Sequence, residues 1–531
     1  MAIGTITKSD KETATNIILE NFDAGLLERI LSEEDVYLGL QQELLSLRSK
    51  VRHQKLAEIV VKLLGDRLLQ SQTIRNEFCK NHNVPSPSTW KPGTASSFEL
   101  CKKIGLPIIF AGAQISLQPP VVTRVEHKPL IPELADYQEE VYNYTLNYIK
   151  HGKSALLSLP TGGGKTLVAT KVVHSYHNKS QHSLTSLWLA HTEELCEQAA
   201  QCLIQVWQAS ANDTAPSVII RAWGRNINKI INGEIFQDAE ANQPETPIHT
   251  IIVSTPRSAI RLLNVPTESS LGKAIQRMSL VVIDEAHRAA AATYRSVISE
   301  LRNVSTNKKF ILGLSATPVR ETYSARKYDG TKELASIFDK LIEPANTFGN
   351  IESPILALQH RGILAKMRVI KLQIGESSSK ELARKISEIR LQNKTNSPAL
   401  FFSSNISNAK IMAMHLADGG LDAEYVTSIV NASERANIIQ NLRNCKIDVL
   451  CNCEILTTGF DAPRVEEIYL ARYTNSPVLY KQIIGRGLRG PQFGGASECK
   501  IYLCGFDLPF DPNPNTSSFA RLVWSMKDHA T

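Results

Sequence analysis

The sequence predicts an α/β protein with two tandem parallel-sheet domains, preceded by a mainly helical N-terminal domain. Short runs rich in β-branched residues alternate with helical stretches, which is typical of parallel strands joined by crossover helices. The pattern occurs twice, and 531 residues are too many for one hydrophobic core. The expected strands are 154–159, 185–190, 249–254, 279–283 and 310–314 in the first set, and 399–404, 423–427, 448–453, 466–471 and 500–505 in the second.

The region before the first sheet has apolar residues at helical spacing. Residues 12–70 predict three or four helices, and a short helix is expected near 96–104. The proline-rich stretch "SLQPPVVTRVEHKPLIP" then marks a domain boundary. The predicted organisation is a helical accessory domain over 1–125, a first lobe over 126–345, a connector over 346–375 and a second lobe over 376–531.

Composition and charge favour a globular protein without a membrane span. Apolar residues make up 43% of the chain and charged residues 21%, and no apolar run is long enough for a membrane helix. No basic start precedes an apolar stretch at the N-terminus, so we expect no secretory signal and a cytoplasmic location. The nine cysteines are expected to be free thiols rather than zinc ligands. The net charge of +7 suits a nucleic-acid partner without requiring one.

The stretch "LSLPTGGGKTLVA" predicts a phosphate-binding turn between a strand and a helix. Its glycine N–H groups and the helix N-terminus converge on one point, where a phosphate chain fits. Lys165 is expected to reach the β- and γ-phosphates of ATP, and Thr166 to hold Mg²⁺. Leu159 stands where this motif normally has Gly or Ala, and a glycine-rich turn without a ligand is the alternative. The remaining predicted nucleotide-binding residues of this turn are Thr161, Gly162, Gly163 and Gly164.

The stretch "LVVIDEAHRA" predicts the acidic partner of this turn. Four apolar residues form a strand, and ligands bind at the carboxyl edge of an open α/β sheet. Asp284 is expected to hold Mg²⁺ there, through water, and Glu285 to polarise the attacking water. The alternative is a capped helix start with two surface acids.

The order of these and further motifs resembles the DEAH-type superfamily 2 helicases and translocases over about residues 130–510. The residues of "LTTGFDAPRV" and "QIIGRGLRG" are most similar to the motifs of one branch, which contains the restriction-enzyme motor subunits and the RadD-like DNA repair helicases. The resemblance implies two RecA-like lobes that close on ATP and Mg²⁺. The stretches that carry it are "PTGGGKT", "LAHTEELCEQ", "VSTPRS", "VVIDEAH", "LSATP", "LTTGFDAPRV" and "QIIGRGLRG".

Arg486 and Arg489 lie three residues apart, so a helix would present both on one face, where two guanidiniums can stabilise a transferring phosphoryl group. The resemblance implies that both reach across the cleft from the second lobe, and that Gln482 helps position the attacking water. A solvated basic helix is the alternative. By the same resemblance, Gln138 reads adenine, Asp461 contacts the ribose or closes the lobe interface, and Ser315 and Thr317 couple the nucleotide site to the cleft. His287, beside Glu285, is expected to bond the acidic motif to the LSATP motif. The alternatives are strand-end caps for Ser315 and Thr317, a core histidine for His287 and a turn residue for Asp461.

Nucleic-acid contacts are implied by the resemblance alone. Hydroxyls, backbone N–H groups and few charges would grip phosphates without reading bases, so little sequence preference is expected. Loop solvation is the alternative for these side chains. The implied contacts are His191, Thr192, Thr255, Arg257, Thr457 and Thr458.

The predicted function is an ATP-dependent helicase or translocase on nucleic acid, with DNA favoured, in DNA repair or in phage defence and restriction. The alternatives are a DEAH RNA helicase, a duplex translocase that never separates strands, and an ATP-gated DNA-binding scaffold that recruits a nuclease. The sequence has no convincing nuclease carboxylate cluster, so a partner would supply any cleavage. Residues 1–125 are interpreted as a DNA-guiding or partner-docking module, or as solvated helices around a small core.

Overall fold

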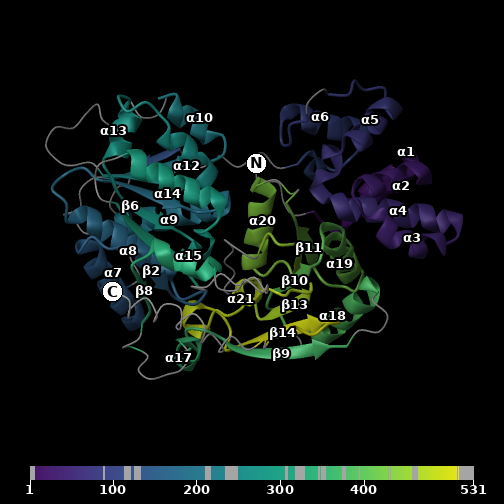
Figure 1. Ribbon diagram of the computed structural model, residues 1–531. Helices are drawn as coiled ribbons and strands as arrows, with labels where there is room; N and C mark the ends of the chain where they lie inside the picture. Colours follow the sequence, from purple (N-terminus) through teal and green to yellow (C-terminus); the bar gives the residue numbers. More distant parts are fainter. Residues whose placement is uncertain are drawn as a thin grey trace.

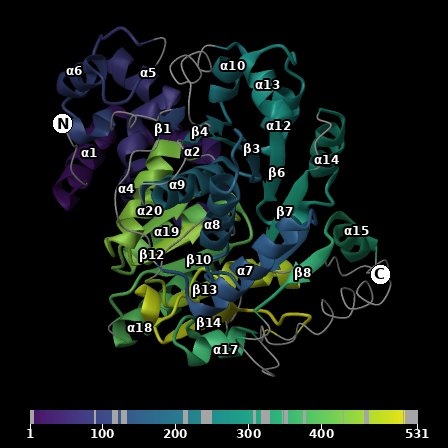
Figure 2. The same ribbon diagram turned by 90° about the vertical axis from the view of Figure 1, so that its left-hand side faces the viewer.

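The computed structural model shows two α/β lobes with a helical body packed against the second (Figures 1 and 2). The predicted fold class, two RecA-like lobes after a helical region, is confirmed. The structure describes residues 6–87, 90–112, 121–124, 133–209, 217–233, 249–304, 309–316, 329–344, 347, 354–373, 378–393, 395–428, 430, 432–456, 464–510 and 512.

The first lobe is built on a sheet of order β1-β4-β5-β3-β6-β7-β2-β8, in which only β1 is antiparallel to its neighbour. Its inner strands are buried on both faces, which is why they read as continuous apolar runs. The strands are β1 (Val122–Arg124), β2 (Ala155–Ser158), β3 (Thr185–Leu189), β4 (Ser217–Ala222), β5 (His249–Ser254), β6 (Met278–Ile283), β7 (Phe310–Ser315) and β8 (Lys340–Ile342).

Helices cover both faces of this sheet, as Figures 1 and 2 show. One apolar core lies between the sheet and the helices α7, α8 and α9, and the opposite face packs against α10 and α12 to α15. The helices are α7 (Asp136–Lys150), α8 (Lys165–Asn178), α9 (Glu193–Ala209), α10 (Asn226–Ile231), α12 (Pro256–Leu263), α13 (Ser270–Gln276), η3 (Ala286–Arg288), α14 (Ala292–Val304) and α15 (Asp329–Ile337).

The second lobe has an all-parallel sheet of order β11-β12-β10-β13-β14-β9. Its edge strand β9 lies within the interval 346–375 that the sequence assigns to a connector, so the second sheet begins inside that interval. The elements are α17 (Pro354–His360), β9 (Lys366–Leu372), α18 (Ser379–Asn393), β10 (Ala399–Ser403), α19 (Ile406–Asp418), β11 (Ala423–Val426), α20 (Ala432–Arg443), β12 (Val449–Asn452), β13 (Glu467–Ala471), α21 (Pro477–Ile484), η4 (Pro491–Phe493) and β14 (Glu498–Cys504).

All ten expected strands are present, and the helices expected over 12–70 and near 96–104 are confirmed. The N-terminal helices share one apolar core with α18 and α19 of the second lobe. The helical body is therefore packed on the second lobe through one continuous set of buried apolar residues, and the predicted domain bounds remain predictions. The elements are α1 (Lys8–Asn21), α2 (Ala24–Glu33), α3 (Tyr37–Leu45), α4 (Ser49–Leu64), η1 (Gly65–Gln70), α5 (Gln72–Asn81), α6 (Ala95–Ile104) and η2 (Ile108–Ala111).

A buried ion pair fixes this docking. Lys410 on α19 is 2% exposed, and its Nζ lies 2.6 Å from Glu34 Oε2 and donates to the Glu34 carbonyl at 2.9 Å. Around it, Arg67 Nε lies 2.7 Å from Glu434 of α20. A buried ammonium is tolerated only when it is paired and hydrogen-bonded, so Lys410 depends on Glu34.

Glu34→Ala is expected to destabilise the chain by about 2–4 kcal/mol, because it leaves the Lys410 ammonium buried without its carboxylate. The measurement is the midpoint of urea unfolding, compared with the parent chain. Adding Lys410→Met to Glu34→Ala removes the unpaired charge and is expected to recover most of the loss. An unchanged midpoint for Glu34→Ala would show that the pair does not stabilise the docking.

No helix within the described parts of the chain is long and apolar enough to cross a membrane. None of the nine cysteines forms a disulfide, and six of them are buried. Among the described residues no three His, Cys, Asp or Glu side chains come together as a metal site.

A pair of stacked histidines is buried in the first lobe, away from the motifs. His177 of α8 and His249 of β5 are both fully buried, with ring centroids 4.7 Å apart. Burial lowers the pKa of His249 to about 4, and burial and then the His249 ring lower the pKa of His177 well below its usual value. The folded state therefore binds fewer protons than the unfolded state between these pKa values and the ordinary value near 6.5.

The first lobe is expected to be fully stabilised by these histidines above about pH 6.5, and to lose about 1 kcal/mol per histidine for each pH unit below it. Urea unfolding followed by tryptophan fluorescence at several pH values measures the slope. His177→Gln should flatten the slope, whereas His360→Gln, at an exposed position, should leave it unchanged. Equal slopes for the two variants would contradict this explanation.

Candidate active site

The glycine turn lies at the carboxyl end of β2 and opens helix α8. Gly162 and Gly164 both have φ of +83°, a conformation that favours glycine, and Gly164 caps the helix. Lys165 Nζ donates to the carbonyls of Leu159 at 3.1 Å and Pro160 at 3.3 Å. The turn thus forms a cradle with its lysine folded back onto it, and these lysine bonds are weak enough to be exchanged for phosphate oxygens.

Gln138 supports this turn from α7. Its side chain is 4% exposed, Nε2 donates to the Gly163 carbonyl at 3.0 Å, and Oε1 accepts from the Ala135 N–H at 3.0 Å. A Cβ on Gly164 would lie 2.3 Å from Gln138 Nε2, so the amide would have to move, and the φ of +83° at Gly164 itself favours glycine. The structure places Gln138 beneath the phosphate turn, and its reading of adenine stays a prediction.

The two acids emerge from β6, which β7 separates from β2 in the sheet. The Glu285 N–H donates to Asp284 Oδ1 at 2.9 Å, and Glu285 has φ of +50°, which is strained for a residue with a side chain. Burial and the neighbouring Glu285 raise the pKa of Asp284. For Glu285, burial is outweighed by His287, Lys165 and Arg486, which lower its pKa. The carboxylate proposed to polarise water is thus held ionised by three basic side chains.

The electrostatics of the turn depend on both lobes. Burial lowers the pKa of Lys165, the charges of Glu285 and Asp284 oppose that shift, and Arg486 adds to it. Lys165, the two acids and Arg486 therefore form one interacting charge cluster. Arg486 belongs to the second lobe and follows α21, so this cluster spans the cleft between the lobes.

The loop after α21 packs directly against the glycine turn. A Cβ on Gly485 would lie 2.6 Å from Thr161 Cβ, so the two loops are in van der Waals contact. A Cβ on Gly162 would lie 3.9 Å from Arg489 Cγ. The sequence predicts both arginines on one helix face, but α21 ends at Ile484, and both lie in the turn and extended segment that follow. The structure nevertheless brings the Arg486 charge and the Arg489 side-chain stem to the turn that carries Lys165.

A polar relay joins the acids to the second lobe. His287 Nδ1 lies 3.3 Å from Glu285 Oε2, and Gln482 Nε2 lies 3.4 Å from His287 Nε2. Nδ1 of the imidazole thus faces the Glu285 carboxylate, while Nε2 faces the Gln482 amide. Ser315 is buried at the end of β7, between the strands that carry the two motifs. The predicted role of Gln482 in positioning the attacking water, and that of His287 in linking the acidic motif to the LSATP motif, remain predictions.

These residues fit a magnesium-bound triphosphate. The two positive-φ glycines leave room for phosphates at the helix N-terminus, and Lys165 supplies a cation. Thr166 at the start of α8 and Asp284 at the end of β6 supply the hydroxyl and carboxylate oxygens that Mg²⁺ prefers. The predicted roles of both residues in metal binding remain predictions.

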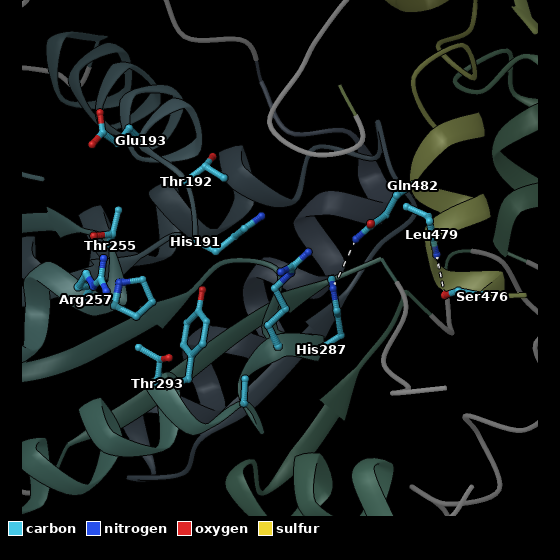
Figure 3. A pocket seen from close by; sticks show the side chains of 14 residues that line it. His191, Thr192, Glu193, Thr255, Arg257, His287, Thr293, Ser476, Leu479 and Gln482 are labelled. Atoms are coloured by element: carbon cyan, nitrogen blue, oxygen red, sulfur yellow. Dashed lines mark hydrogen bonds between the residues drawn. The ribbon is translucent and has the colours of Figure 1, made fainter. Parts of the chain in front are cut away.

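A cavity of about 750 Å³ opens beside this relay, between the lobes (Figure 3). The side chains of the first lobe and those of α21 face one another across it, and Gln482 reaches toward His287. The first-lobe lining includes all four described residues predicted to contact nucleic acid, His191, Thr192, Thr255 and Arg257. The other lining residues are Glu193, Pro256, His287, Arg288, Ala291, Thr293, Tyr294, Ser476, Leu479 and Gln482.

Two of the predicted contacts also have a structural role. Thr192 Oγ1 accepts from the Leu195 N–H at 3.3 Å, and Thr255 caps α12 by accepting from the Ser258 N–H at 3.4 Å. Burial and the charge of Arg288 lower the pKa of His191 to about 4, so it is neutral at pH 7. Arg288 and Ser476 are lining residues that the sequence reasoning missed; Arg288 follows the acidic motif directly, which was the available signal.

Four predicted residues lie outside the described residues. These are Thr317, Thr457, Thr458 and Asp461.

Comparison with known proteins agrees with this geometry. Residues 131–320 match the type III restriction enzyme res subunit family, and residues 381–490 match the helicase conserved C-terminal domain family. Over its two lobes the chain is therefore similar to the superfamily 2 helicases, an ATP-hydrolysing class, and its first lobe is similar to that of the restriction motors.

Among individual proteins, the chain is similar to the Saccharomyces cerevisiae protein IRC3, named as a candidate ATP-dependent helicase. The two are 28% identical over 397 residues, which cover 67% of this chain and 50% of the relative. The Schizosaccharomyces pombe irc3, named as a candidate mitochondrial ATP-dependent helicase, is 26% identical over 387 residues, which cover 70% and 57%. The chain thus spans about half the length of these curated relatives.

Solved structures show the same fold. The ATP-dependent Type ISP restriction-modification enzyme LlaBIII bound to DNA superposes with a TM-score of 0.51 at 16% identity, over 75% of this chain and 29% of that one. Mss116p bound to single-stranded RNA superposes with a TM-score of 0.50 at 17% identity, over 70% of both chains.

Proposed function

We propose that the chain is an ATP-driven motor that moves along nucleic acid, with DNA as its preferred track. The observation that carries the proposal is that the interlobe cavity and the candidate ATP site share two side chains. His287 and Gln482 line the interlobe cavity, and His287 also lies 3.3 Å from Glu285, the residue proposed to activate water. A strand in the cavity and a nucleotide at the glycine turn would therefore act on the same two side chains.

The chain's own residues account for the steps. Lys165 binds the phosphates from the first lobe, while Arg486 and Arg489 bind them from the second, so ATP favours the closed arrangement. Glu285 orients and deprotonates water, and Mg²⁺ bound beside Asp284 would neutralise phosphate charge. Loss of the γ-phosphate removes the contact to the arginines and lets the lobes separate.

The nucleic-acid side of the proposal rests on the cavity lining. Thr192, Thr255 and Arg257 present hydroxyl groups and a guanidinium suited to phosphates. DNA is preferred because the motifs "LTTGFDAPRV" and "QIIGRGLRG" resemble those of the DNA-acting branch. This support is by analogy. A repair or phage-defence role, with a nuclease or other subunit as partner, belongs to the same proposal, as does the cytoplasmic location; one relative is named as mitochondrial.

ATP hydrolysis measured with single-stranded DNA, duplex DNA, forks and RNA tests the function. Stimulation by DNA above RNA, absent in Lys165→Ala, is the expected result. Greater stimulation by RNA would favour an RNA helicase, and triplex displacement without fork unwinding would favour a duplex translocase. Full biological activity in Lys165→Ala would instead favour a scaffold, and would overturn the motor.

A further inference from the structure

The segment 361–365, between α17 and β9, is tied to the first lobe by one side chain. Arg361 Nη1 donates to Asp136 at 2.8 Å and 2.7 Å, and Nη2 donates to the Thr347 carbonyl at 3.0 Å. Asp136 opens α7, two residues before Gln138, whose amide holds the glycine turn. The anchor of this segment on the first lobe is therefore the same helix that supports the phosphate turn.

The backbone of segment 361–365 is paired with residues 485–492 of the second lobe, the loop after α21 that carries Arg486 and Arg489 and is here called the arginine loop. Leu364 and Arg489 form an antiparallel bridge, and the Ala365 N–H donates to the Leu488 carbonyl at 2.9 Å. The Gly490 N–H donates to the Ile363 carbonyl at 2.9 Å. These bonds hold Arg489 from both sides along its backbone, so the segment determines where this arginine lies.

Two further contacts complete the arrangement. Gln492 Nε2 donates to the Arg361 carbonyl at 2.8 Å, so residue 361 bonds to the second lobe through its backbone and to the first through its side chain. A Cβ on Gly162 would lie 3.5 Å from Leu364 Cδ2. Segment 361–365 therefore touches the phosphate turn, the α7 helix and the arginine loop at once.

We propose that segment 361–365 is a positioning element for catalysis: the Arg361–Asp136 pair anchors it to the first lobe, and its paired backbone aligns Arg489 with the glycine turn. The inference rests on the proposed function, since it requires that Arg489 acts in ATP hydrolysis. Arg361 is a positioning residue, because its contacts run through Asp136 and Gln492 rather than to phosphate. Loss of the Arg361 side chain should reduce the fraction of time that Arg489 is aligned with the glycine turn. It should therefore lower kcat more than it weakens ATP binding.

The expected effect is modest, because the pair is half exposed: Arg361 is 36% exposed and Asp136 is 62% exposed. Exposed ion pairs of this kind shift an equilibrium by a small factor, so Arg361→Ala and Asp136→Asn should each lower kcat by roughly three- to fivefold. The KM for ATP should change by less than about twofold, because the phosphate cradle is untouched.

The experiment is a double-mutant cycle on nucleic-acid-stimulated ATPase activity with the full chain. Arg361→Ala combined with Asp136→Asn should be no slower than either single variant, because both remove one interaction. Arg361→Lys, which keeps the charge, should recover at least half of the activity. Arg384→Ala is the matched control: it removes another exposed ion pair of an arginine, with Glu388 on α18 of the second lobe, and should leave kcat unchanged.

A rise in KM at unchanged kcat would overturn the proposal, as would multiplicative losses in the double variant or an equal loss in Arg384→Ala. Lys165→Ala, measured in the same assay, separates this from failure of the proposed function. If the parent chain hydrolyses no more ATP than Lys165→Ala, both the function and the inference fall. If the parent chain is active and Arg361→Ala has the same kcat, only the inference about segment 361–365 is contradicted.

Discussion

Arg489→Ala is expected to lower nucleic-acid-stimulated ATP turnover by about a thousandfold or more, while ATP affinity changes by only a few-fold. The guanidinium stabilises charge that develops on the transferring phosphoryl group, so its removal affects the transition state more than the bound substrate. The structure supports this role, since Arg489 Cγ lies 3.9 Å from the position of a Cβ on Gly162. Steady-state turnover and equilibrium binding of a fluorescent ATP analogue measure the two quantities.

Arg384→Ala again serves as the control, because it removes a guanidinium from the same lobe at an exposed position. It should retain parental turnover. Arg489→Ala with parental turnover would exclude charge stabilisation by this side chain. A loss of ATP affinity as large as the loss of turnover would instead assign Arg489 to ground-state binding.

Glu285→Gln is expected to reduce turnover by about a hundred- to ten-thousandfold and to tighten nucleic-acid binding when ATP is present. Glutamine keeps the shape and one acceptor oxygen for His287 but cannot take a proton from water. Hydrolysis then stops with the γ-phosphate in place, and the lobes stay closed on the strand. Turnover and the affinity for a labelled single strand, with and without ATP, are the measurements.

Glu333→Gln, in the first lobe but paired with Arg295 away from the motifs, should leave both quantities unchanged. Equal or weaker strand binding by Glu285→Gln in ATP would count against closure driven by the γ-phosphate.

The sequence predicts the strands that are apolar and buried, and it predicts poorly the strands that carry charged residues. Strand β4 was missed because Arg221 interrupts its apolar run; the structure buries this guanidinium at 1% exposure by pairing it with Glu197 at 2.9 Å. Strand β9 was missed because it is an edge strand that carries Lys366, Arg368 and Lys371, and edge strands tolerate charge. In both cases the deciding contacts lie outside the strand itself.

The candidate active site also has a part that the sequence predicts and a part that it does not. The glycine turn and the acidic motif are local patterns, so their residue types alone indicated their chemistry. The anchoring of Arg489 through Arg361 and Gln492, and the docking of the N-terminal helices through Lys410 and Glu34, depend on pairs separated by more than a hundred residues. A single sequence contains no signal for such pairings.

The central claim is that the γ-phosphate joins the two lobes through the arginine loop. Amide hydrogen exchange of residues 485–492 tests it most directly, in Glu285→Gln protein with saturating ATP and, separately, with saturating ADP. Slower exchange in ATP than in ADP, with the difference lost when Arg489→Ala is added, is the predicted result. Equal exchange with the two nucleotides would contradict the account.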